Sequence, residues 1–403
     1  MKIAFYAPLK APDHPDPSGD RTVGRLLLAA LRKGGITPVL ASRFRARLSG
    51  DSLAEQKKFA AKGRGLADKL IAKYKKLPKA ARPKAWFTYH LYYKAVDWIG
   101  PQVAAALDIP YIVAEASHAP KRAGGPFAFS HAAAETAMKQ AAAIFCLNPA
   151  DKECLHGIVA ARKLVDLPPF LDIDAFLGPN PRGPDRALGR QKLAQHYRLD
   201  PDMPWLLAVG MMRKGDKLAS YQALAEALRH VTRAYQVLVV GDGPARSEVE
   251  AAFTPIARRV VWLGQKPATD LPEIYASADL FVWPAINEAF GMALLEAQAC
   301  GTPVIAGASG GVPGIVADGE TGWLSTPGDT TAFAADVDFA LERELVPIRL
   351  VTAAHARKFH DIAAAAATLK KTLEKVTGEK VTGEKVTGEK VTGEKVAGKK
   401  VVK

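Results

Sequence analysis

Residues 279–324 read DLFVWPAINEAFGMALLEAQACGTPVIAGASGGVPGIVADGETGWL. An apolar, strand-like run at 279–283 opens this stretch, a helical segment follows at 290–300, and a second apolar run comes at 303–306. Strands that alternate with helices are typical of a parallel sheet covered by helices on both faces. The stretch therefore predicts part of a doubly wound α/β domain.

The same alternation extends to both sides of this stretch. Further strand-like runs precede it in the second half of the chain, at 205–210, 236–241 and 259–263. A separate series occupies the first half, at 2–8, 36–42, 85–89, 109–114 and 142–147. Prolines concentrate between the two series, at 166–204, which is typical of a connection between domains. The pattern predicts two tandem Rossmann-like domains, residues 1–180 and residues 181–345.

The end of the chain differs from both domains. Residues 346–374 have the character of a C-terminal helix. From Lys375 the motif Lys-Val-Thr-Gly-Glu repeats four times and then decays to KVAGKKVVK. A five-residue repeat with a glycine in each copy is too short for a packed unit and disfavours a helix. We expect residues 375–403 to form a disordered, lysine-rich tail.

The composition is that of a soluble globular protein, with 48% hydrophobic and 24% charged residues among 403. No stretch approaches the ~18 uninterrupted apolar residues of a membrane-spanning helix. The first residues, MKIAFYAPLKAPDHP, lack the apolar core and cleavage site of a signal peptide. Three cysteines without CxxC spacing favour a reducing compartment. These observations predict a cytoplasmic protein.

The net charge of +14 is concentrated in two segments. Residues 43–84 carry a net charge of +11, and the tail at 375–403 carries +4. Within 52–77 apolar residues recur at helical spacing, and we expect Gly63 and Gly65 to interrupt this helix. Such a basic helix fits either an ordinary core helix with a solvated face or a surface that binds anionic lipid on the inner face of a membrane. No motif predicts nucleic-acid binding.

Two carboxylates stand eight positions apart in the opening stretch, Glu288 and Glu296. A helix is expected to begin between them, near Gly291, and backbone N–H groups at a helix start bind anions such as phosphates. Glu288 at the loop edge is suited to sugar hydroxyls, and Glu296 inside the helix to a second polyol such as a ribose. Such a pair is ordinarily two solvated glutamates, but the surrounding glycines favour a binding site.

This E-x7-E motif, followed by AQACGTPVI at 297–305, resembles the retaining GT-B glycosyltransferases of family 4. VGDGP at 240–244 and DGETG at 318–322 are also similar to that family. The likeness is most specific over 205–325 and weaker elsewhere. It implies a GT-B fold, in which two Rossmann-like domains face each other across a cleft. The C-terminal domain would hold a nucleotide sugar, the N-terminal domain would hold the acceptor, and the last helix would return to the N-terminal domain.

Several site residues follow from the resemblance, position by position. Glu296 would bind the ribose, and Glu288 would hold the donor sugar. The other donor-binding positions that the resemblance implies are Phe290, Gly291, Met292, Gly19, Gly241 and Gly243. The family also places an Arg and a Lys after the first strand of its second domain, where they hold the diphosphate. In the segment VGMMRKGDK at 209–217, these roles fall to Arg213 and Lys217, with Lys214 as an alternative.

Two histidines follow strand-like runs in the first half of the chain, His90 and His118. Single histidines are more often structural, but ligands of doubly wound sheets bind at the carboxyl ends of strands. His118 matches a cleft histidine of the family near the donor sugar and is expected to be catalytic. His90 and Arg21 are expected on the acceptor side. Gly19 lies in a loop that resembles the family's glycine-containing loop at the diphosphate.

The resemblance implies a hexosyltransferase (EC 2.4) that moves a sugar from a nucleotide donor to a glycan or lipid-linked acceptor with retention of configuration. Synthesis of a cell-surface polysaccharide or lipopolysaccharide would be its setting. Guanidinium, ammonium and helix-start amides can stabilise the departing diphosphate, so neither a metal nor a cofactor is expected. We interpret three DxD sequences as incidental, at 172–174, 200–202 and 336–338.

Several features of the function stay open in the sequence. A UDP-sugar is mildly preferred over a GDP-sugar as donor, and the acceptor is not identified. A sugar-nucleotide epimerase of the same architecture is one alternative. A non-catalytic basic binding protein is another, although the intact pair of Glu288 and Glu296 disfavours it.

Overall fold

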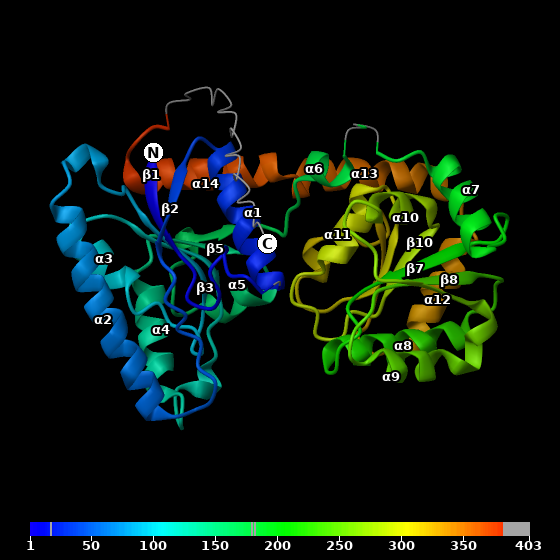
Figure 1. Ribbon diagram of the computed structural model, residues 1–403, viewed down its shortest axis with the longest axis horizontal. Coiled ribbons are helices and arrows are strands. Elements are labelled where there is room, and N and C mark those ends of the chain that lie inside the picture. Colours follow the sequence, from blue (N-terminus) through cyan, green and yellow to red (C-terminus); the bar gives the residue numbers. More distant parts are fainter. Residues whose placement is uncertain (17, 179, 181–182, 382–403) are drawn as a thin grey trace, which may run out of the picture.

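The structure, a computed structural model, describes residues 1–16, 18–178, 180 and 183–381 (Figure 1). Within these residues the strands form two parallel sheets of six strands, one in each lobe of the molecule. The predicted α/β architecture of two doubly wound domains is therefore confirmed. In the described part of the chain, no helix has both the length and the apolar character needed to cross a membrane.

The N-terminal sheet has the strand order β2-β1-β3-β4-β5-β6. Its strands are β1 (Lys2–Tyr6), β2 (Thr37–Ser42), β3 (Trp86–Leu91), β4 (Tyr111–Ala116), β5 (Ala143–Cys146) and β6 (Leu164–Asp166). The helices of this domain are α1 (Gly19–Lys33), α2 (Leu53–Lys75), α3 (Gly100–Leu107), α4 (Ala128–Gln140) and α5 (Pro149–Leu155). Successive residues of a strand point to opposite faces, so Ile3 and Phe5 join one apolar core while Ala4 and Tyr6 join the other.

The C-terminal sheet has the order β12-β11-β10-β7-β8-β9. Its strands are β7 (Trp205–Val209), β8 (Gln236–Val240), β9 (Val260–Gly264), β10 (Leu280–Trp283), β11 (Val304–Gly307) and β12 (Gly322–Ser325). The helices around it are α6 (Ile173–Leu177), α7 (Arg186–Tyr197), α8 (Asp216–His230), α9 (Arg246–Phe253), α10 (Leu271–Ser277), α11 (Met292–Ala299) and α12 (Thr330–Leu341). The edge strands β6 and β12 were not predicted, because both are only partly buried and lack the continuous apolar run of the central strands.

The last two helices run across both lobes (Figure 1). α13 (Leu345–His360) packs on α11 of the C-terminal domain, and α14 (Ile362–Thr377) packs on α1 of the N-terminal domain. The apolar face of α14 enters the same core as Ile3 and Leu27. The predicted start of the disordered tail, residue 375, is wrong. The helix α14 continues to Thr377, and Val381 is buried in that core. The remaining repeats, 382–403, lie outside the described residues.

The basic helix α2 is continuous, so the predicted interruption at its glycines is wrong. Gly63 is buried where α2 crosses Trp98, and a Cβ on Gly63 would lie 2.2 Å from the Trp98 Cβ. Gly65 faces the other way and would bring its Cβ within 4 Å of no described atom outside its own helix. Gly63 therefore permits close packing rather than a break in the helix.

This difference predicts opposite effects of the same substitution at two sites on one helix. Gly63→Ala should destabilise the protein by about 1–3 kcal/mol, because the new methyl group overpacks the contact with Trp98. Gly65→Ala should stabilise it by about 0.5–1 kcal/mol, because alanine loses less backbone entropy in a helix. Urea denaturation of both variants measures the two free energies of unfolding. Equal effects at the two sites would contradict the described packing of α2.

Candidate active site

Each sheet contains one point where the order of strand addition reverses. In the N-terminal sheet it lies between β1 and β3, and in the C-terminal sheet between β7 and β10. Loops after such strands diverge to opposite faces of the sheet, which leaves a crevice at the carboxyl ends of the strands. The loops after β1, β3, β7 and β10 carry most of the residues that the sequence singles out, so topology gathers these residues at two facing sheet edges.

Lys217 lies in the first turn of α8, the helix that follows β7, and its side chain turns toward the loop after β10. Its Nζ atom donates a hydrogen bond of 2.6 Å to Glu288 Oε2 and lies 5.1 Å from the centre of the Trp283 ring. Trp283 Nε1 donates to the same Glu288 oxygen at 3.2 Å. A lysine, a carboxylate and an indole thus form one connected group. Lys214, by contrast, is 77% exposed and pairs with Glu248.

The loop that carries Glu288 is fixed in an unusual backbone conformation. Ala285 and Asn287 have φ angles of 55° and 50°, a left-handed region that costs free energy for residues other than glycine. Asn287 Nδ2 donates to Asp216 Oδ1 at 3.0 Å, which ties the loop to the start of α8. A Cβ on Gly310 would lie 1.9 Å from the Glu288 carbonyl oxygen, so only glycine permits this approach. These contacts position Glu288 before any ligand arrives.

One cavity of about 600 Å³ brings the two sheet edges together. From the C-terminal domain Arg213, Lys217 and Glu288 line it, and Gly19 comes from the start of α1 in the N-terminal domain. The remaining lining residues are Ser18, Asp20, Thr22, Val23, Met211, Trp283, Ala289, Phe290, Gly291, Met292, Ala293 and Leu294. A larger hollow of about 810 Å³ lies between α7 and α10, but it contains none of the residues at the strand ends.

The start of α11 also borders this cavity. Gly291 has a φ angle of 76° and precedes the first helical residue, Met292, so its backbone has a conformation that glycine adopts without strain. The free N–H groups of such a helix start favour an anion. Phe290 lines the cavity, and its side chain packs against the core of the N-terminal domain. Phe290 therefore joins the two domains beside the cavity.

Glu296 is placed apart from this group and does not line the cavity. It lies one helical turn beyond Met292, where its Oε2 atom accepts a hydrogen bond of 2.9 Å from Tyr275. Burial raises the pKa of Glu296 to about 7, although the Tyr275 hydrogen bond opposes this shift. Of the four charged residues expected at the donor, the structure thus brings Arg213, Lys217 and Glu288 to one cavity and sets Glu296 behind them.

His90 lies at the end of β3 within a group of acidic side chains. Its Nδ1 atom lies 3.1 Å from Asp20 Oδ1 and 3.4 Å from Glu115 Oε1. Burial disfavours protonation of His90, but Glu115 and Asp20 outweigh it and raise its pKa. Burial raises the pKa of Glu115 to about 7 against the effect of His90. His90 and Glu115 both have a φ angle of 62°, so strained backbone holds this group at the ends of two adjacent strands.

Two predicted residues have side chains engaged elsewhere. His118 lies outside the cavity, and its Nε2 atom lies 3.3 Å from Glu135 Oε2 on α4. Arg21 Nη1 donates to the carbonyl oxygens of His14 and Pro15 in its own loop. The structure therefore does not bring His118 and Arg21 together with Lys217 and Glu288.

Gly241 and Gly243 act through the packing of backbone segments. A Cβ on Gly241 would lie 1.9 Å from the Gly210 carbonyl oxygen, and one on Gly243 would lie 2.3 Å from that of Met212. These glycines allow the loop after β8 to lie directly against the loop that carries Arg213. They support the position of Arg213, and neither lines the cavity.

The sequence alone assigned no role to Trp283, Asp20 or Glu115. Trp283 is the last residue of β10. Its position at the carboxyl end of a central strand could have indicated a place at the ligand site. Glu115 offered a similar signal as a carboxylate inside an otherwise apolar strand. Asp20 carried a weaker signal, because an acidic residue in the first turn of a helix is common.

Comparison with known proteins agrees with this geometry. Residues 191–359 match the family model described as glycosyl transferases group 1. The chain is 29% identical over 318 residues to a D-inositol 3-phosphate glycosyltransferase of Xylanimonas cellulosilytica, covering 72% of this chain and 73% of that protein. It is 28% identical over 243 residues to a sulfoquinovosyl transferase of Arabidopsis thaliana, covering 56% of this chain and 44% of the relative. The chain spans about half the length of most of the curated relatives that it matches.

Solved structures share the architecture. HepE of Anabaena in complex with UDP aligns with a TM-score of 0.69 and 18% identity, over 93% of this chain and 100% of that chain. A sucrose-phosphate synthase from Thermosynechococcus elongatus aligns with a TM-score of 0.68 and 20% identity, over 94% and 99%. These likenesses establish the GT-B fold. The family match covers residues 191–359, so the likeness to glycosyl transferases group 1 is shown for this part of the chain.

Proposed function

We propose that this protein transfers a sugar from a nucleotide-sugar donor to a glycan or lipid-linked acceptor with retention of anomeric configuration. The observation that carries the proposal is the cavity between the domains, where Arg213, Lys217, Glu288 and the start of α11 converge. Two cationic side chains and a helix start suit a diphosphate, and a carboxylate beside them suits sugar hydroxyls.

In this proposal the protein acts mainly on the leaving group. As the bond between the anomeric carbon and the diphosphate oxygen breaks, negative charge grows on the diphosphate. Arg213, Lys217 and the amides at Gly291 and Met292 stabilise that charge within the cavity. Glu288 orients Lys217 and holds the sugar. The acceptor oxygen bonds to the anomeric carbon from the leaving-group side, and its proton passes to an oxygen of the diphosphate.

We assign the acceptor to the N-terminal side of the cavity. Asp20 lines the cavity and contacts His90, so the acidic group around His90 reaches the edge of the site. Carboxylates and an imidazole are suited to hydroxyl donors of a glycan. The synthesis of a cell-surface polysaccharide or lipopolysaccharide is the setting that we propose for this acceptor.

A thermal-shift panel of UDP-, GDP- and ADP-sugars tests the proposed function. We expect UDP-sugars to stabilise the chain most, because the structurally similar HepE was crystallised with UDP. The same shift should be absent for a Glu296→Ala variant if this residue binds the ribose. Stabilisation by none of the donors would contradict the proposal. Conversion of the bound donor into an epimer without any acceptor would favour a sugar-nucleotide epimerase.

The raised pKa of Glu296 predicts that donor binding depends on pH. With a pKa of about 7, the carboxyl group is mainly neutral at pH 6 and mainly ionised at pH 8. We propose that the ribose of a bound donor reaches Glu296 behind the cavity. Because the ionised form accepts hydrogen bonds from ribose hydroxyls more strongly, the Kd for UDP-glucose should then fall roughly tenfold between these values. Calorimetric titration of wild type and Glu296→Gln checks this expectation. An equal pH dependence in both proteins would assign it to another group.

We propose that α2 brings the protein to anionic membranes from the cytoplasmic side. Lys58, Lys69 and Lys73 are exposed and share one face of the helix. Each basic residue near such a surface contributes about 1 kcal/mol, so replacing these three by glutamine should reduce binding to phosphatidylglycerol vesicles roughly 100-fold. Co-sedimentation measures the loss, and phosphatidylcholine vesicles are the control. Unchanged binding of the variant would contradict this role for α2.

A further inference from the structure

Three side chains with atoms suited to metal binding meet on the N-terminal domain, outside the cavity between the domains. They are His118, from the loop after β4, and His131 and Glu135, from α4. One potential ligand atom of each lies within 4.8 Å of those of the other two. None of the three residues lines the cavity assigned to the donor.

Local geometry explains why these groups converge. His131 and Glu135 are four positions apart on α4, so they occupy the same face of the helix. The His118 ring lies over the His131 ring, with centroids 5.0 Å apart. His118 Nε2 lies 3.3 Å from Glu135 Oε2, while Lys139 holds the other oxygen of this carboxylate. One oxygen of the Glu135 carboxylate is thus directed at the histidines, and Lys139 holds the second oxygen.

His131 carries the decisive observation. This residue is only 3% exposed. Its ring interacts with the backbone of Ala119, but its Nε2 atom has no hydrogen-bond partner of normal geometry among the described residues. A buried polar atom without a partner costs free energy, and most such atoms in folded proteins are satisfied. The contact between His118 and Glu135 leaves this nitrogen without a partner. An ion among the three side chains would give it a partner.

We propose that His118, His131 and Glu135 bind a divalent transition-metal ion. Imidazole nitrogens with one carboxylate are the ligand set that Zn²⁺ prefers, and three protein ligands leave a fourth position for water. Lys139 would hold Glu135 in place through its contact with the other carboxylate oxygen, as outer partners of metal ligands commonly do.

The ion would join the loop after β4 to α4. In that loop Ser117 precedes His118 and donates a hydrogen bond of 2.6 Å to Asp151 on α5. Asp151 in turn interacts electrostatically with His90, on the side that we assign to the acceptor. Metal binding would therefore stabilise the segment next to the acceptor side, whereas the sugar transfer proposed above proceeds in the cavity without passing through the ion.

Metal titration of the full chain after treatment with a chelator tests the site. We expect one Zn²⁺ per chain, and Co²⁺ as a spectroscopic probe should give visible absorption bands of a four-coordinate ion. His131→Gln should weaken Zn²⁺ binding about 100-fold or more, since even loss of an outer partner costs roughly 10- to 100-fold. Glu135→Gln provides a second variant, at a half-buried position, should His131→Gln fail to fold.

His230 offers a matched control. It forms a pair with Glu226 on α8 at 3.2 Å and the same four-residue spacing, but it is exposed and has no third ligand in the described structure. His230→Gln should leave Zn²⁺ affinity unchanged. The proposal is overturned if wild type binds Zn²⁺ no more tightly than His131→Gln and Glu135→Gln, or if His230→Gln weakens binding as much as they do. Because the test measures metal binding directly, its result is independent of whether sugar transfer is the activity.

Discussion

Replacing Lys217 by methionine should lower kcat for sugar transfer by about 100- to 1000-fold, the range seen when one charge-stabilising group is removed from an active site. Lys217 is the cation that contacts Glu288 directly, at 2.6 Å, inside the cavity. Methionine retains much of the side-chain volume and removes the charge that would stabilise the departing diphosphate. Release of nucleoside diphosphate, measured with a donor selected in the thermal-shift panel and a membrane extract as acceptor source, gives the rate.

Lys214 provides the matched control three positions away. Its ammonium group is 77% exposed and pairs with Glu248 outside the cavity, so Lys214→Met should change kcat by less than about twofold. The pair of variants decides between the two lysines that the sequence left as alternatives. A large loss for Lys214→Met with little loss for Lys217→Met would move the diphosphate contact to Lys214 and contradict our assignment.

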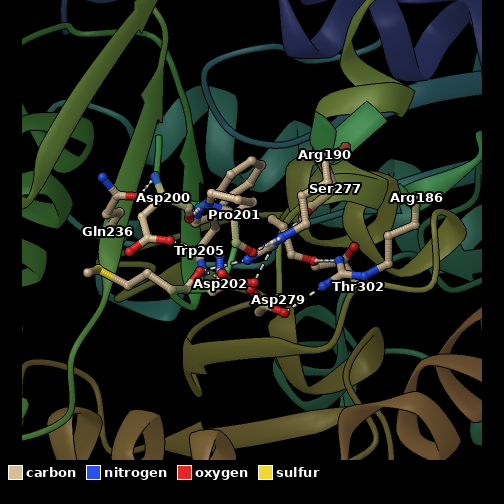
Figure 2. A network of polar contacts seen from close by, with 12 residues as sticks. Arg186, Arg190, Asp200, Pro201, Asp202, Trp205, Gln236, Ser277, Asp279 and Thr302 are labelled. Carbon is tan, nitrogen blue, oxygen red and sulfur yellow. Dashed lines mark hydrogen bonds and ion pairs between the residues drawn. The ribbon is translucent and has the colours of Figure 1, made fainter. Parts of the chain in front are cut away.

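Asp279→Ala should destabilise the protein by roughly 3–5 kcal/mol, because it would leave partly buried arginines without their counter-charge. Figure 2 shows the network around this residue. The Asp279 carboxylate accepts hydrogen bonds from Arg186 at 2.5 Å, from Arg190 at 3.0 Å and from the Trp205 backbone N–H at 2.7 Å. The side chains of Asp279 and Arg190 are 17% and 15% exposed, so water compensates little for the loss. Urea denaturation followed by circular dichroism measures the change.

A second ion pair that also involves α7 is the control for this prediction. Lys192 on α7 and Glu273 on α10 approach within 3.1 Å, but their side chains are 55% and 40% exposed. Exposed pairs contribute little to stability, so Glu273→Gln should cost less than about 1 kcal/mol. Equal losses for Asp279→Ala and Glu273→Gln would show that burial does not determine the contribution of these contacts.

Much of the fold could be predicted because its signals are local. The sequence alone reveals the apolar runs that form β7, β8 and β10, and the helices between them, without knowledge of any contact. Strand order is not local, yet the resemblance of the E-x7-E motif and of the segment at 209–217 to a known family already indicated Glu288, Arg213 and Lys217. The structure brings these three residues to one cavity.

What escaped prediction depends on contacts between distant residues. Gly63 suggests a helix break until Trp98 is known to pack on it. The helix start near Gly291 was predicted, but the hydrogen bond that Glu296 accepts from Tyr275 on α10 was not. His118 follows a strand end as expected, but Glu135 and His131, on the next helix, draw its ring away from the cavity. No residue spacing in the sequence predicts these contacts between side chains.

A crystal structure of the protein with UDP-glucose tests the central claim most directly. The account predicts the diphosphate within hydrogen-bond distance of Arg213 and Lys217, at the start of α11, with the glucosyl group beside Glu288 and facing Gly19 across the cleft. Density for the nucleotide in the hollow between α7 and α10, or diphosphate oxygens remote from both cationic side chains, would contradict it.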